Sequence, residues 1–117
     1  MTIQQAIGQL DALKPNTFTV TEKLCWLSRL DGQVRTEILR VPAPFDGYTD
    51  QTPLSQPLLV PAPYDECYLR YMEAQIDYCN GEISRYQNAM ALFNAVYTAY
   101  GAWHLRNNTP QSQGFSF

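Results

Sequence analysis

The chain of 117 residues has few charged side chains: Asp, Glu, Lys and Arg make up 16% of it, against about a quarter of an average soluble protein. The net charge is −3, and the eight Lys and Arg residues are scattered along the sequence. A protein that binds nucleic acid normally carries a basic patch. The sequence therefore predicts no specific nucleic-acid binding, and its low charge indicates a surface partly covered by partners.

Long apolar runs and paired cysteines are also lacking. No stretch approaches the roughly 18 apolar residues of a membrane-spanning helix, and the first residues do not resemble a signal peptide. Three cysteines are present, an odd number, and they form no CxxC pair. This usage is typical of a reducing cytoplasm. We therefore expect a cytoplasmic protein with no membrane association.

The residues that usually carry catalysis or metal binding form no known arrangement. There is no glycine-rich phosphate loop, Ser/His/Asp set or nucleotide fingerprint. His104 is the single histidine, and its spacing from Cys67 and Cys79 matches no usual zinc site. Cys25 lies on an apolar helical face, where a buried structural cysteine is expected. The sequence predicts no catalytic residue, no cofactor and no metal, and hence no enzyme.

Several carboxylates lie close together in the second half of the chain and could in principle serve as an acid and a base. We expect them instead on the solvated face of a helix, with Glu66 and Arg70 forming an ion pair across one helical turn. The carboxylates concerned are Asp65, Glu66, Glu73, Asp77 and Glu82.

Apolar periodicity and capping residues predict four helices. A capping box of Thr2 and Gln5 opens a helix over residues 3–13. The second helix opens at Thr19 or Thr21, passes through Gly32 and ends before Pro42. The third begins near residues 63–64 and ends at Asn80-Gly81, which indicates a left-handed stop. The fourth covers about residues 82–105.

Proline dominates the segment between the second and third helices. Residues 42–63 hold six of the eight prolines, which excludes a helix there. We expect an exposed loop followed by an extended arm, and a flexible tail over residues 107–117. The sequence thus predicts an all-α protein, a small bundle of about four helices in a single domain over residues 1–117.

Tyrosine is unusually frequent, with eight residues, mostly in the last two predicted helices. A small core accommodates about half of them, and the remainder suit a protein interface. Stacking on single-stranded nucleic acid would also use tyrosines, but the acidic balance disfavours it. We expect the third and fourth helices to form a hairpin that packs on the second through Leu24, Leu27, Leu30, Tyr68, Met72, Ile76, Met90 and Phe93.

Several segments resemble the head–tail connector, or adaptor, proteins of long-tailed phages and prophages. The most specific are "WLSRLDG" (residues 26–32), "VPAPYDE" (60–66) and "EAQIDYCNGE" (73–82), together with "TIQQAIGQLDALKPN" at the start. The resemblance covers most of the chain except residues 43–56 and the last dozen. It implies a mostly helical virion protein that forms a ring between portal and tail around the DNA channel, after assembly in the host cytoplasm. Its motifs are not catalytic.

A ring needs two different surfaces on each subunit, and proline-stiffened segments lose little entropy on binding. We therefore predict that a projecting arm over residues 58–63 lies on the neighbouring subunit. The predicted interface residues are Leu58, Leu59, Val60, Pro61, Pro63 and Tyr64. Portal and tail or stopper proteins are the expected further partners. The alternative is a small helical protein-binding regulatory module of phage or host origin, outside the virion.

Overall fold

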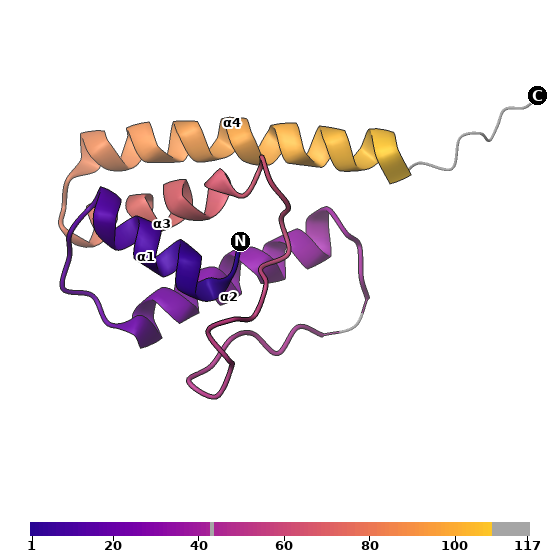
Figure 1. The fold of residues 1–117 in the computed structure, drawn as a ribbon. Helices are drawn as coiled ribbons and strands as arrows, with labels where there is room; N and C mark the ends of the chain where they lie inside the picture. The colour runs from indigo at the N-terminus through magenta and orange to yellow at the C-terminus, as the bar shows by residue number, and fades with distance from the viewer. Residues whose placement is uncertain (43, 109–117) are drawn as a thin grey trace, which may run out of the picture.

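The computed structural model describes residues 1–42 and 44–108. Its four helices are α1 (Ile3–Leu13), α2 (Val20–Glu37), α3 (Glu66–Cys79) and α4 (Ile83–Asn108). No strand is present in this described part. The predicted all-α bundle of four helices is confirmed (Figure 1).

Side chains that cap the backbone determine where the first two helices begin. Thr2 and Gln5 form a complete capping box at α1, and Thr19 and Glu22 form the same arrangement at α2. Each box satisfies amide groups that have no partner inside the helix. The predicted start at Thr2 is confirmed, and of the two starts predicted for the second helix, Thr19 and Thr21, the structure shows Thr19.

The C-terminal end of α2 differs from the prediction, which extended the helix almost to Pro42. The helix ends at Glu37, and the Leu39 N–H turns back to bond the Val34 carbonyl at 2.9 Å. Arg40 then adopts a left-handed backbone with φ of 55°. The apolar spacing continues past the point where the backbone leaves the helix, so spacing alone overestimated its length.

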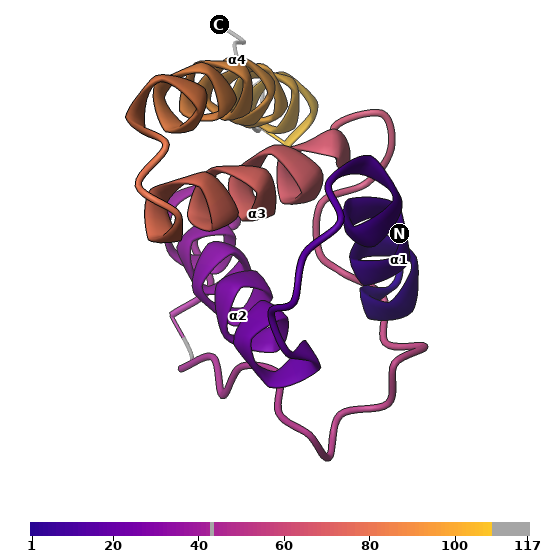
Figure 2. The same ribbon diagram turned by 90° about the vertical axis from the view of Figure 1, so that its left-hand side faces the viewer.

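α3 lies at the centre of the bundle. It packs against α4 on one side and against α1 and α2 on the other (Figure 2). Of the eight side chains predicted to hold the hairpin on α2, seven are buried, and Met90 packs partly buried against the same core. The hairpin turn uses Gly81 with φ of 74°, which confirms the predicted left-handed stop.

The fourth helix is much longer than its partner, with 26 residues against 14 in α3. The two helices are antiparallel, so the C-terminal part of α4 extends past the N-terminal end of α3, as Figure 1 shows. Asn107 and Asn108 belong to this helix, so the predicted flexible tail does not start at residue 107. The remainder of that prediction, residues 109–117, lies outside the described residues.

The described residues of the long connection between α2 and α3, 38–42 and 44–65, contain no helix, as predicted. The later part of the connection lies beside the start of α1, where the N–H groups of Ile3 and Gln4 donate to the carbonyls of Gln56 and Leu54. The Leu58 N–H donates to the Met1 carbonyl at 2.9 Å. The connection is thus fixed to the N-terminal end of the chain.

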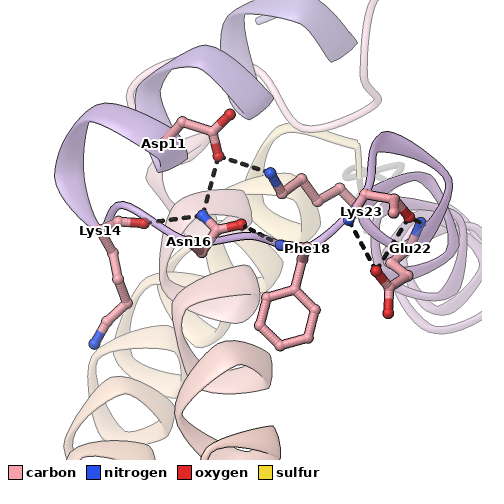
Figure 3. A network of polar contacts seen from close by, with 7 residues as sticks. Asp11, Lys14, Asn16, Phe18, Glu22 and Lys23 are labelled. Carbon is pink, nitrogen blue, oxygen red and sulfur yellow. Dashed lines mark hydrogen bonds and ion pairs between the residues drawn. The ribbon is translucent and has the colours of Figure 1, made fainter.

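A polar network joins α1, α2 and the link between them (Figure 3). Asp11 accepts hydrogen bonds from Lys23 at 2.8 Å and from Asn16 at 3.1 Å. The Lys23 side chain is almost fully buried, so this ion pair orients α2 against α1. Hydrogen bonding to Lys23 lowers the pKa of Asp11.

A second ion pair connects the end of α1 to α3. The Lys14 ammonium lies 2.6 Å from Asp77, whose side chain is 1% exposed. The prediction that Asp77 lies on a solvated face is wrong, because the end of α1 covers it. The predicted ion pair between Glu66 and Arg70 is confirmed at 3.0 Å.

Candidate functional site

The predicted subunit interface divides into a buried and an accessible part. Leu58 and Val60 are 7% and 0% exposed in the chain's own core. The prediction of a projecting arm is therefore wrong, because these two side chains fill space between the helices. Contact of the other residues with a neighbouring subunit stays a prediction. They are exposed or half-buried: Leu59, Pro61, Pro63 and Tyr64.

A buried carboxylate holds this segment inside the molecule. Asp31 of α2 is fully buried, and it accepts hydrogen bonds from the Tyr68 hydroxyl at 2.6 Å and the Leu59 N–H at 3.2 Å. The Tyr68 hydroxyl in turn accepts a bond from the Val60 N–H at 2.7 Å. One side chain from α2 and one from α3 thus bind consecutive amides of the connection.

The same carboxylate also fixes the first half of the connection. The Tyr48 hydroxyl donates to Asp31 at 2.5 Å. The Ser28 hydroxyl accepts from the Tyr48 N–H at 2.7 Å and donates to the Tyr48 carbonyl at 3.2 Å. Burial raises the pKa of Asp31, although its hydrogen bonds act in the opposite direction. With three donors directed at it, Asp31 serves as a structural anchor.

Residues 45–50 run antiparallel to α2 and close to it. A Cβ added at Gly32 would lie 3.6 Å from the Phe45 ring, and one added at Gly47 would lie 3.3 Å from the Ser28 Cβ. Two residues of the segment therefore lie alongside four residues of the helix. The segment is not a regular strand, because Gly47 adopts a left-handed backbone with φ of 82°. Farther along, the Thr21 hydroxyl bonds Asp50 at 3.0 Å.

Three adjoining hollows follow this segment, with volumes of about 740, 500 and 370 Å³. The first two share Thr36 and Phe45, and the last two share Cys25 and Ser28 among other residues. We call these three adjoining hollows together the α2 groove. Its central part is lined by Cys25, Ser28, Arg29, Gly32, Thr36, Phe45, Asp46 and Gly47.

The groove carries charges of both signs, with Glu37 beside two arginines at one end and Arg29 at its centre. Arg35 and Arg40 line the largest hollow, and the Arg35 guanidinium lies over the Phe45 ring at 5.5 Å. Asp46 and Asp50 line the opposite end. The sequence reasoning missed this groove, because it depends on how the connection returns along α2.

A second surface is the exposed side of α4. Within this helix only Arg85 and Arg106 carry a formal charge, so residues 86–105 are uncharged. Leu92 and Leu105 are 49% and 66% exposed. We call this surface the α4 outer face. Its exposed apolar residues are Ala91, Leu92, Ala95, Ala99, Ala102 and Leu105, and the uncharged polar residues Asn94 and Thr98 are exposed among them. A solvated helix normally carries charges on its outer side.

Aromatic rings join the end of the connection to the last turns of α4. Tyr64 lies 5.8 Å from Tyr100 and 5.9 Å from Trp103, measured between ring centroids. His104 lies against Tyr100 at 6.1 Å. Pro61 and Pro63 remain exposed beside this cluster, so its outer edge is open to solvent.

The cysteines are separated in the fold. Cys67 is buried, and burial raises the pKa of its thiol. Cys25 and Cys79 are exposed, so the prediction of a buried Cys25 is wrong: its side of α2 borders the groove and not the core. Residues 1–42 and 44–108 contain no group of three potential metal ligands. No helix in that part of the chain is long and apolar enough to cross a membrane.

Known proteins offer no direct guide to these surfaces. No family model matches the chain, and neither the curated proteins nor the solved structures include a match to it. The resemblance to phage connectors therefore rests on the sequence segments alone and stays a prediction.

Proposed function

We propose that the chain is a structural assembly protein, a head–tail connector that forms a ring of many copies between portal and tail in a phage particle. The observation that carries this proposal is the α4 outer face. Residues 86–105 carry no formal charge, and both leucines of the face are about half exposed or more. Exposed apolar patches of this kind mark sites of protein association.

The size of the face favours an assembly of many weak contacts. Twenty helical residues cover about 30 Å, and a helix is about 10 Å wide, which gives roughly 300 Å². A stable pair of proteins buries about 800 Å² on each partner. One such face therefore supports only weak association. A ring gives every copy two neighbours and further contacts with the portal, so the same face contributes to a stable assembly.

A head-to-tail contact needs a second, different surface on the neighbour. The exposed part of the predicted interface, with Pro61, Pro63 and Tyr64, suits this role because it is apolar and supported by the aromatic cluster. In such a particle the protein would have no catalytic role and no cofactor. It would occur in the virion and, before assembly, in the host cytoplasm.

The test combines light scattering with electron microscopy of the full chain, alone and mixed with the portal protein of the same phage genome. We expect a monomer alone and rings with portal. Ala95→Glu places a charge on the α4 outer face and should abolish the rings. Ala12→Glu, an equivalent change at an exposed position of α1, should leave them intact.

A persistent monomer or dimer, with no rings in the presence of portal, would contradict the connector role and favour the regulatory protein-binding module. The neighbouring genes provide an independent check. Portal and capsid genes beside this one would support a connector, and their absence would count against it.

A further inference from the structure

The α4 outer face combines a strip of small side chains with a large apolar one. Ala91, Ala95 and Ala99 recur every four residues, so they follow one another along one side of the helix. Leu92 adjoins them and is 49% exposed, and the polar side chains exposed among them are uncharged. Another chain can approach such a strip closely, and covering it removes apolar surface from water.

The sequence that follows α4 matches this surface in composition. Residues 109–117, TPQSQGFSF, contain no charged side chain and include two of the five phenylalanines of the chain. Pro110 disfavours helical backbone at the residue before it, which favours a change of chain direction directly after α4. Phe115 and Phe117 are two positions apart, so in an extended chain both rings lie on the same side.

The length of this segment also matches the face. An extended residue spans about 3.3 Å, so Phe115 and Phe117 can lie up to about 23 and 30 Å from Asn108. A helix rises about 1.5 Å per residue, which places Ala95 and Leu92 about 20 and 24 Å back from Asn108 along α4. A segment that reverses direction after the helix is therefore long enough to bring its two rings to the centre of the face.

We propose that residues 109–117 fold back over the α4 outer face in the free protein and place Phe115 and Phe117 against it. A short tether holds a segment at a roughly millimolar effective concentration, so at micromolar protein the segment occupies the face before a second copy does. The proposal rests on the assembly role in one respect: a neighbouring subunit in the ring must displace the segment. Free copies then stay monomeric until the portal supplies further contacts.

Thiol reactivity tests this cover in the isolated full-length protein. Ala95→Cys introduces a thiol at the centre of the face, in a background where the two exposed natural cysteines are replaced by serine. The new thiol should react with a maleimide at least tenfold faster once Phe115→Ser and Phe117→Ser are added. The same two changes should leave the rate unchanged for a thiol introduced by Ala12→Cys, at an exposed position of α1.

The protection should not depend on protein concentration, because the segment belongs to the same chain. Equal rates with and without the two phenylalanines would overturn the proposal. Protection that grows with protein concentration would overturn it in favour of a second copy as the occupant. A faster reaction at position 12 as well would overturn it by indicating a general loosening of the fold. These measurements need no portal, so a failure to form rings with portal would contradict the connector role alone.

Discussion

Asp31 places a carboxylate in the interior of a small protein, with hydroxyl and amide donors around it. Its pKa is raised by burial above the ordinary value of 3.8. At a pH between the ordinary pKa of the unfolded chain and the raised pKa of the folded protein, Asp31 keeps a proton in the folded protein that it has lost in the unfolded chain. The free energy of unfolding must then fall as the pH rises through this interval.

This reasoning gives a pH prediction for Asp31→Asn. Urea unfolding of the wild type and the variant should be compared from about pH 4 upwards. The stability of the wild type relative to the variant should decrease with rising pH and become constant above the folded pKa. A difference that is constant or grows with pH across this range would contradict the raised pKa.

The two tyrosines that bind Asp31 are expected to differ in importance. Tyr68→Phe removes a donor to the buried carboxylate and also leaves the buried Val60 N–H without its acceptor. A buried polar group that is left without a hydrogen-bond partner lowers stability by about 1–3 kcal/mol. Tyr48→Phe removes a donor only. Chemical denaturation should therefore show the larger loss of stability for Tyr68→Phe, and equal losses would argue against the role of Val60.

The anchoring role of Asp31 escaped the sequence reasoning, although a signal was present. Asp31 follows Leu27 by four residues and precedes Val34 by three, so it lies on the apolar side of α2. That spacing indicates burial, but it does not identify the donors. They come from residues 48, 59 and 68, and only the path of the connection brings them together.

At the scale of helices, the hairpin of α3 and α4 depends on one ring at its centre. Phe93 is 3% exposed and lies 5.4 Å from Tyr71 and 5.2 Å from Tyr97. Phe93→Ala should destabilise the protein by about 3–5 kcal/mol, as large-to-small changes in cores do. The neighbouring Leu92 is half exposed, and Leu92→Ala should cost less than about 1 kcal/mol. A small effect at Phe93 in urea unfolding would place this side chain outside the core.

The ion pair of Lys14 and Asp77 ties α1 to α3 in a different way. Lys14→Ala leaves the buried Asp77 carboxylate without its cation. Such changes cost about 3–5 kcal/mol, and we expect the lower part of this range because Lys14 is 20% exposed. Arg85→Ala breaks the exposed pair with Glu82 and should change stability by less than about 1 kcal/mol. If the two variants had similar unfolding temperatures, the prediction would be wrong, and water would be solvating the Asp77 carboxylate in place of Lys14.

The capped starts of α1 and α2 were more predictable than the end of α2 or the start of α3, which lies at Glu66 and not near residues 63–64. A capping box involves residues three positions apart, so Thr2 located the start of α1, and Thr19 was one of the two starts predicted for α2. The end of α2 depends on how Leu39 and Arg40 turn back onto the helix, which apolar spacing does not record. The α4 outer face could also be predicted only in part. Its lack of charge is visible in the sequence, but its exposure follows from the position of α4 on the outside of α3.

For the whole molecule, the charge distribution predicts how the protein behaves toward DNA. A connector channel must let DNA slide, and each phosphate neutralised by Lys or Arg adds salt-dependent affinity. Arg70 is paired with Glu66 and Glu73, and Arg85 with Glu82, which leaves little free positive charge on the hairpin.

We therefore expect no duplex binding at physiological salt in an electrophoretic assay at micromolar protein. In a ring, acidic residues should outnumber basic ones along the inner wall. A shift that disappears with added salt, and with replacement of Arg70 and Arg85 by alanine, would instead indicate a nucleic-acid-binding role for α3 and α4.

The separation of the three thiols provides a way to observe assembly. Cys67 is buried, whereas Cys25 borders the α2 groove and Cys79 ends α3 at the hairpin turn. A maleimide dye would react at these two exposed positions, and replacing either cysteine with serine would leave a single labelled site. Copies carrying donor dyes could then be mixed with copies carrying acceptors. Energy transfer between them would report the spacing of neighbouring subunits in solution, on the natural cysteines of the chain.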